Sequence, residues 1–156
     1  MGILTNEIKE FINRQKLGFI ATVCPDGTPN LSPKGTTIAW DNDHLVFADI
    51  HSPGTVNNLL IKPAIEINVV DGFVRKGFRF KGTATILSDG KLFDEIVAYY
   101  KNKGAIYLIN HIVLVKVERV LPVISPVYDT GISESEVRKR WINYWNDLEP
   151  GNMLEE

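Results

Sequence analysis

Cysteine, long apolar runs and a surplus of either charge are what this sequence has least of. Cys24 is the only cysteine among 156 residues, so an internal disulfide framework is excluded and a reducing compartment is favoured. No apolar stretch approaches the roughly 20 residues that cross a bilayer. The residues after Met1 lead into charged positions rather than into a signal peptide. We therefore expect a cytoplasmic protein without a membrane partner.

The net charge is small, because 17 lysines and arginines are balanced by 19 aspartates and glutamates, which gives −2 at pH 7. Nucleic acids need a concentrated basic face. The basic run Arg138-Lys139-Arg140 lies among acidic residues and is typical of a solvated helix face. The charge balance therefore predicts no nucleic-acid partner.

The motifs of common catalytic and metal sites are missing as well. The three histidines, His44, His51 and His111, lack the spacing of metal ligands, and one cysteine cannot complete a zinc site. The sequence contains no Gly-x-Ser-x-Gly elbow, Walker loop or Gly-x-Gly-x-x-Gly fingerprint. Nothing basic lies beside Cys24 to activate its thiol. We predict no metal site and no catalytic side chain, and we interpret His44 and His111 as structural.

What is present is the composition of a globular domain, with 44% hydrophobic and 23% charged residues. Apolar alternation and β-branched runs between Gly, Pro and Asp turns predict six strands. They are expected at 19–23, 31–40, 45–48, 64–70, 77–87 and 111–121. Helical spacing predicts four helices, at 4–15, between Pro53 and Pro63, from Leu92 to near Gly104, and at 133–148. The residues 149–156 are expected to form a frayed tail.

Six strands joined mostly by short turns predict a mainly β fold, a small antiparallel barrel with peripheral helices, in a single domain over 1–156. Pro33 cannot donate to a sheet ladder, so its strand is expected to be an edge or to bulge. Ser133 and Glu136 have the spacing of a capping box for the last helix. The aromatic face of that helix is expected to pack on the barrel or on a second copy of the chain.

A candidate binding site lies between Asn30 and Leu60. Two strands each carry a polar segment with proline and glycine, Ser32-Pro33-Lys34-Gly35 on the first and His51-Ser52-Pro53-Gly54-Thr55 after the second. If the strands pair, these segments can lie side by side. A lysine, hydroxyls and the free N–H groups of a helix start would then suit a phosphate.

A third segment, Arg75-Lys76-Gly77-Phe78-Arg79, offers further cations. These could lie along a planar heteroaromatic ring whose oxygen becomes anionic on reduction. Gly35 and Gly77 would let the backbone come close to such a ring. The sequence therefore predicts an anion seat at 30–60 with a wall from 75–79.

Several short motifs follow one another along nearly the whole chain. They begin with Lys16-Leu17-Gly18-Phe19-Ile20-Ala21-Thr22, Pro25-Asp26-Gly27-Thr28-Pro29 and Ser32-Pro33-Lys34-Gly35. They continue with Phe47-Ala48-Asp49, Ser52-Pro53-Gly54-Thr55-Val56, Asn58-Leu59 and Arg75-Lys76-Gly77-Phe78-Arg79-Phe80-Lys81-Gly82. No single motif is decisive, but the ordered set resembles the pyridoxamine 5′-phosphate oxidase-like, FMN-binding split-barrel family.

The resemblance implies a six-stranded antiparallel split β-barrel of Greek-key type, which forms a homodimer and holds FMN at the subunit interface. By motif position, Ser32, Pro33, Lys34 and Gly35 would line the cofactor, and Ala48 and Asp49 would flank the ring. Ser52, Thr55 and Asn58 would reach the phosphate or the ribityl chain. Lys76, Gly77 and Phe78 would complete the site.

The function that the resemblance implies is that of an FMN-binding flavoprotein, an oxidoreductase of a small, unidentified substrate. The oxidase proper carries an Arg-Lys pair where this chain has Gly54-Thr55, and an arginine-bearing C-terminal segment that 148–156 lack. Oxidation of pyridoxamine phosphate itself is therefore not expected. The alternatives are a non-catalytic protein that stores, senses or carries a flavin, and a haem or deazaflavin binder on the same barrel.

Overall fold

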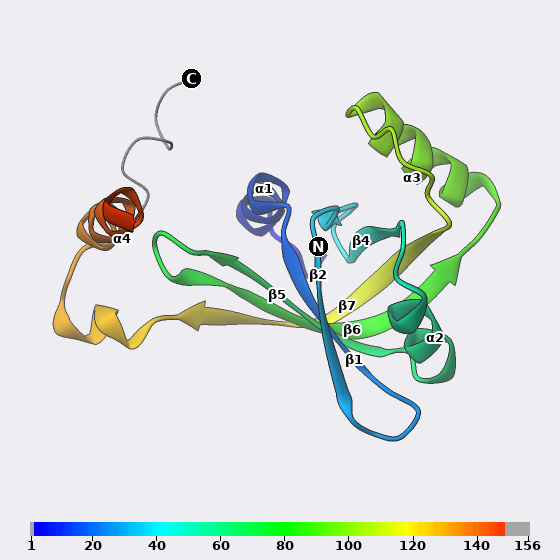
Figure 1. Cartoon of the computed structure of the whole chain (residues 1–156), viewed down its shortest axis with the longest axis horizontal. Coiled ribbons are helices and arrows are strands. Elements are labelled where there is room, and N and C mark those ends of the chain that lie inside the picture. The colour runs from blue at the N-terminus through cyan, green and yellow to red at the C-terminus, as the bar shows by residue number, and fades with distance from the viewer. Residues whose placement is uncertain (1, 149–156) are drawn as a thin grey trace.

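The computed structural model describes residues 2–148, in which one curled antiparallel sheet is flanked by four helices (Figure 1). The seven strands of the described part lie in the order β2-β1-β5-β6-β7-β4-β3. Their bounds are β1 Gly18–Val23, β2 Pro29–Lys34, β3 Ile38–Ala39, β4 His44–Asp49, β5 Ala64–Asp71, β6 Lys76–Leu87 and β7 His111–Ile124. The predicted mainly β fold with peripheral helices, of the split-barrel type, is confirmed.

The predicted strand at 31–40 is two strands, which is why the sheet has seven rather than six. β2 ends at Lys34 and β3 begins at Ile38, because Pro33 and Gly35 interrupt the run. β2 pairs only with β1 and forms an edge of the sheet, as Pro33 predicts. The predicted strands 31–40 and 45–48 are expected to pair with each other. Only the second part of the first strand, β3, pairs with β4.

The last strand runs further than its sequence predicts, since β7 continues through Pro122 to Ile124. β4 pairs with β7 only as far as Lys116. Beyond that residue one side of β7 carries no partner strand among the described residues, so a proline there removes no ladder hydrogen bond. Pro122 instead stands opposite Phe78 of β6.

The helices are α1 (Asn6–Gln15), α2 (Pro53–Ile61), α3 (Lys91–Asn102) and α4 (Glu134–Leu148), and a 3₁₀ turn, η1, spans Pro126–Thr130. The predicted capping box is confirmed, because Ser133 Oγ accepts from the Glu136 N–H at 3.3 Å and Glu136 Oε2 accepts from the Ser133 N–H at 2.9 Å. The tail predicted at 149–156 lies outside the described residues. Among residues 2–148, none of the helices has the length and apolar character needed to cross a bilayer.

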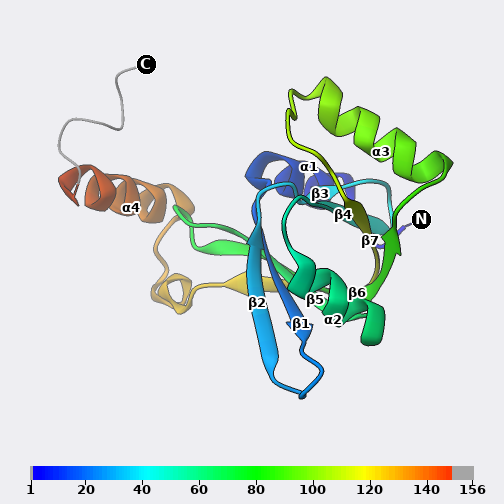
Figure 2. The same ribbon diagram turned by 45° about the vertical axis from the view of Figure 1, so that its right-hand side comes forward.

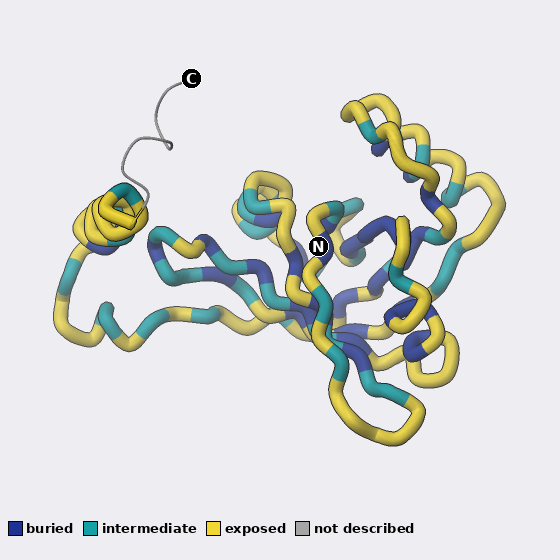
Figure 3. Tube along the Cα trace, in the orientation of Figure 1, coloured by how far each residue is buried: buried dark blue, intermediate teal, exposed yellow. Residues whose placement is uncertain are grey.

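The core lies along the inner side of the curled sheet (Figure 3). Apolar side chains of six strands meet there with α1 and with Leu59 of α2; the largest fully buried ones are Phe47, Phe80, Ile12, Ile20, Leu45 and Ile67. A second cluster joins α3 to β3, β4 and the start of β7, and its buried members are Ile38, Val46, Ala48, Ile96, Tyr100, Ile109 and Ile112. α2 packs against β1 and β6 (Figure 2).

The chain leaves the barrel through the end of β7 and forms an arm, defined as η1 with α4. α4 lies beside the tip of the β5–β6 hairpin, at the opposite end of the molecule from α2 and α3 (Figures 1 and 2). Arg138 of α4 contacts the buried Asp71 carboxylate at 3.0 Å. Val137 is the buried residue of this helix, whereas Tyr144 and Trp145 stay 48% and 42% exposed.

The Asp71 contact makes a pH dependence of stability testable. Burial alone would raise the pKa of the Asp71 carboxyl, but hydrogen bonds from the Phe73 N–H, Arg138 and the Val74 N–H hold it below its ordinary value. A carboxyl with a depressed folded pKa stabilises the fold above its unfolded pKa of about 3.9, and this contribution is lost as the pH falls through the folded value.

We expect Asp71→Asn to lower the free energy of unfolding at neutral pH, and to flatten its decline below about pH 5 relative to the unsubstituted protein. Denaturant unfolding followed by tryptophan fluorescence at several pH values measures both effects. Parallel pH curves for the two proteins would contradict this role of Asp71.

Candidate functional site

The start of α2 is an open, positive helix end. Pro53 occupies the first turn and has no N–H, Ser52 makes no side-chain capping bond, and the first turn carries no acidic residue. The N–H groups of Gly54 and Thr55 therefore have no acceptor among the described residues. Because unsatisfied N–H groups and the helix dipole both favour negative charge, this end of α2 can bind an anion.

Lys34 brings a buried cation to the same region. It ends β2, is 8% exposed, and donates from Nζ to Ser32 Oγ at 2.5 Å. Burial lowers the pKa of Lys34, and the neighbouring Asp49 carboxylate partly opposes this by raising it. Asp49 in turn accepts from the Ser52 N–H at 2.8 Å, so it connects the lysine to the start of α2. The two polar segments, 32–35 and 51–55, therefore lie close together, as the sequence predicts. Asp49 connects them, whereas β2 and β4 are not paired in the sheet.

His111 is a residue of this cluster that sequence reasoning missed. Its Nδ1 lies 2.8 Å from Asp49 Oδ2, and the two residues stand opposite each other in the β4–β7 ladder. The Asp49 side chain is only 5% exposed, whereas that of His111 is 35% exposed. A carboxylate that holds one ring nitrogen fixes the tautomer and leaves Nε2 available. The structural role predicted for His111 is present, but the residue also belongs to the candidate site.

The remaining predicted residues between 32 and 58 lie around this cluster. The Ala48 N–H donates to Thr36 Oγ1 at 2.9 Å, which ties β4 to the segment between β2 and β3. Thr55 and Asn58 are buried on α2, and the Asn58 amide donates to Thr22 Oγ1 of β1 at 3.0 Å. Pro33 is exposed on the edge strand.

Lys76, Gly77 and Phe78 do not join this cluster within one chain. They begin β6 at the hairpin tip near α4, at the other end of the molecule from α2 (Figure 1). Lys76 pairs with Glu134 at 3.1 Å and Phe78 packs edge-on against Phe11 at 5.3 Å between ring centroids. The structure therefore separates the twelve predicted residues into two groups.

A cleft of about 430 Å³ adjoins the first group, between the end of α1, the loop after β2 and the end of α3. Gly35 and Thr36 belong to its wall, and the Tyr100 hydroxyl donates to the Thr36 carbonyl at 2.6 Å. Burial raises the pKa of Tyr100, so its hydroxyl stays protonated and the side chain adds no charge to the wall of the cleft. The complete lining is Asn13, Lys16, Gly35, Thr36, Ile38, Tyr99, Tyr100, Lys103, Ala105 and Tyr107.

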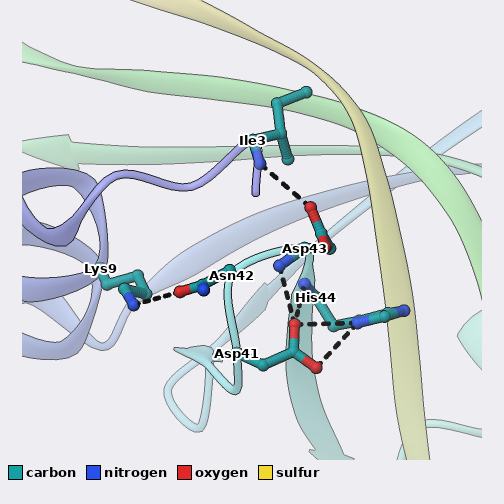
Figure 4. Close-up of polar contacts among 6 residues, drawn as sticks. All are labelled: Ile3, Lys9, Asp41, Asn42, Asp43 and His44. Atoms are coloured by element: carbon teal, nitrogen blue, oxygen red, sulfur yellow. Dashed lines mark hydrogen bonds and ion pairs between the residues drawn. The ribbon is translucent and has the colours of Figure 1, made fainter. Parts of the chain in front are cut away.

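The carboxylate pair at Asp41 and Asp43 lies outside the candidate site and has a structural role (Figure 4). Asp41 Oδ1 accepts from the N–H groups of Asp43 and His44 at 2.7 and 2.8 Å, and the His44 ring lies 2.9 Å from the same carboxylate. Asp43 Oδ1 accepts from the Ile3 N–H at 3.0 Å. The turn thus holds the N-terminal segment, and the contacts of His44 with Asp41 are part of that structure.

The first group fits the FMN expected from the sequence in charge and in space. An open helix end and a buried lysine are the donors that a phosphate needs. A Cβ added at Gly35 or at Gly54 would meet no atom within 4 Å, so there is room beside both backbones. Gly77 differs, because its Cβ would collide with the Val69 carbonyl.

Comparison with solved structures gives similar folds in several bacterial proteins. HupZ of Group A Streptococcus is 29% identical, with a TM-score of 0.71 over 79% of this chain and 96% of that chain. An FMN-binding protein of Syntrophomonas wolfei is 20% identical, with a TM-score of 0.65 over 78% and 87%. HutZ, the haem storage protein of Vibrio cholerae, is 22% identical, with a TM-score of 0.62 over 78% and 94%.

No curated protein matches this sequence. The family model described as pyridoxamine 5′-phosphate oxidase matches residues 4–123, which include all seven strands apart from the last residue of β7. This range contains both groups of predicted site residues and the cleft beside the first. The chain therefore belongs to the pyridoxamine 5′-phosphate oxidase family.

Proposed function

We propose that this protein is an FMN-binding flavoprotein and an oxidoreductase of a small anionic substrate. The observation that carries the proposal is the uncapped start of α2 beside the buried Lys34, which Asp49 joins to it. FMN supplies a phosphate for these donors and an isoalloxazine ring that accepts and returns electrons when bound. Lys34, Ser52 and Thr55 are assigned to the phosphate end of the cofactor.

A homodimer completes the site in this proposal. Lys76, Gly77 and Phe78 lie far from α2 in one chain, so a second copy is needed to bring them to the cofactor. Exposed apolar side chains on β2 and α2 support such contacts, and the largest are Leu31, Leu60 and Ile61. We assign the whole range 1–156 to one domain that acts in the reducing cytoplasm.

The cleft beside Gly35 and Thr36 is the proposed substrate pocket. Lys16 and Lys103 line it, and its lining contains no carboxylate. Neither lysine forms an ion pair with a described residue. Three tyrosines give the pocket flat apolar walls. These features favour a small molecule with a planar body and an anionic group.

We expect the double substitution Lys16→Gln and Lys103→Gln to weaken binding of 1-naphthyl phosphate at least tenfold, because two charge-assisted contacts are lost. The uncharged 1-naphthol serves as the reference ligand, and its binding should change little. Lys101→Gln, in the last turn of α3 two residues before Lys103 but outside the lining, is the matched control. Equal affinities in the double variant and the control would contradict the assignment of this pocket. FMN affinity, measured on the same variants, shows whether the cofactor seat is intact.

Turnover separates an enzyme from a carrier. The FMN-loaded protein should be bleached by NADH or NADPH without oxygen, and the flavin colour should return when an electron acceptor is added. A protein that binds FMN but is reduced by neither donor would support storage, sensing or transport of the flavin instead.

Haem binding is the second candidate, and His111 is the observation that favours it. Asp49 holds its Nδ1, and Nε2 makes no hydrogen bond to a described residue, which is the usual arrangement of a metal-binding imidazole. HutZ, whose fold is similar, is a haem storage protein. A Soret band in place of flavin bands in the loaded protein would select this candidate.

A further inference from the structure

A second, smaller cleft lies at the base of the arm, where β6 begins and β7 ends. Its volume is about 150 Å³, and it is lined by Arg75, Ser125, Val127, Val137, Arg140 and Trp141. The lining contains two arginines and no carboxylate. A water molecule occupies about 30 Å³ of the liquid, so the cleft can hold an ion of several heavy atoms.

Arg75 lines this cleft and carries an unsatisfied donor. Its guanidinium stacks on the indole of Trp141, with Cζ 3.6 Å from the ring centroid. Stacking uses the flat face of the guanidinium, so the N–H bonds, which lie in its plane, remain free for an acceptor. The Nε atom is buried and has no hydrogen-bond partner among the described residues. Because buried donors nearly always have a partner, an N–H in this state is rare in a folded protein.

The backbone of Arg75 is held in an unusual conformation. Its φ is 57°, in the left-handed region that glycine and asparagine adopt more readily than arginine. The Arg75 N–H donates to the Asp71 carbonyl at 2.8 Å, and its carbonyl accepts from the Ser125 N–H at 3.0 Å. An arginine in such a position suggests that its side chain has a role there.

Two acidic residues near the cleft are engaged elsewhere. Asp71 pairs with Arg138 at 3.0 Å, and Glu134 pairs with Lys76 at 3.1 Å. Within residues 2–148, neither Arg75 nor Arg140 forms an ion pair. The cleft is therefore positive, with two guanidinium groups, an indole wall and a buried N–H that lacks an acceptor.

We propose that this cleft is a binding site for a compact oxyanion, a phosphate group or a carboxylate, held by Arg75 and Arg140 against Trp141. Guanidinium groups match both kinds of oxyanion through paired N–H donors. Within one chain the site lies at the opposite end from α2 (Figure 1), so it is separate from that chain's own proposed FMN phosphate seat.

The test is a titration of ¹⁵N-labelled protein with inorganic phosphate, sodium acetate and sodium chloride at matched ionic strength, followed through the arginine Nε–H signals. We expect phosphate or acetate to move the Arg75 Nε–H signal in a saturable way, and chloride to leave it in place. A preference for phosphate assigns the site to a phosphate group, and a preference for acetate assigns it to a carboxylate.

Arg140→Gln should weaken this binding at least fivefold without unfolding the chain, because Arg140 is exposed on α4. Lys139→Gln removes the same charge one residue away, outside the lining, and should bind as the unsubstituted protein does. Shifts no larger than those with chloride, or equal binding by both variants, would overturn the proposal. The absorption of added FMN, measured on the same samples, reports the flavin site independently.

Discussion

Replacing Lys34 by methionine together with Thr55 by valine should lower the affinity for FMN about 100-fold. The double variant removes a buried cation and a hydroxyl at the start of α2, and a lost hydrogen bond to a charged group costs about 1.5–3 kcal/mol. About 1.4 kcal/mol corresponds to a tenfold change in affinity, so the two losses together give two orders of magnitude. Fluorescence titration of the apoprotein with FMN measures this effect.

Riboflavin, which lacks the phosphate, is the ligand control for this experiment. Its affinity should change little in the double variant, so the preference for FMN over riboflavin should nearly vanish. Lys62→Met removes the same charge at the other end of α2, where Lys62 is the exposed C-cap, and should leave FMN binding intact. An equal loss for both flavins would contradict the assignment of Lys34 and Thr55 to the phosphate.

Substituting Gly77 by alanine should destabilise the protein by about 3 kcal/mol or more, since overpacking a filled site costs 1–3 kcal/mol and occasionally more. The added Cβ would lie 2.1 Å from the Val69 carbonyl oxygen and 2.8 Å from the Val70 Cα. Both atoms belong to the backbone of β5, so relief requires the paired strands to separate. Chemical denaturation of the FMN-free protein measures the change.

Gly35→Ala is the matched control, because a Cβ there meets nothing within 4 Å. We expect its free energy of unfolding to stay within about 0.5 kcal/mol of the unsubstituted value, in the range typical of surface substitutions without a special mechanism. The sequence suggests that both glycines let the backbone approach a flavin ring. If Gly77→Ala keeps its stability and loses only FMN, close packing against β5 is not the reason for a glycine at this position.

Much of the fold can be predicted from the sequence because its signals are local. The alternation in β5 and β6, the capping box at Ser133 and the helix start at Pro53 each depend on residues within one element. The structure differs from the sequence-based prediction where an element's extent depends on a strand that is distant in the sequence. β7 extends through Pro122 because β4 begins opposite Lys116 and reaches no further along β7, and no pattern near Pro122 records that.

The candidate site shows the same division. The anion seat is visible in the sequence because Lys34, Ser52 and Thr55 lie in two short segments rich in proline and glycine. The contact between Asp49 and His111 cannot be seen in the sequence, because 62 positions separate the two residues. They become neighbours only through the pairing of β4 with β7.

Neither of the two clefts could be predicted either, because each combines side chains from segments far apart in the chain. The sequence suggests Arg75 as a cation for a flavin ring, and the structure places its guanidinium over Trp141, a contact that no local pattern indicates. Side chains that lie on a hairpin tip or at a helix end have several neighbours within reach, and the choice among them depends on tertiary packing that local patterns do not specify.

The visible absorption spectrum of the purified protein, as isolated and after titration with FMN, tests the central claim most directly. We predict flavin bands, either at once or on addition of FMN, with saturation at one FMN per chain. A spectrum without flavin bands in the isolated protein, together with no uptake of added FMN, would contradict the assignment of this barrel as a flavoprotein.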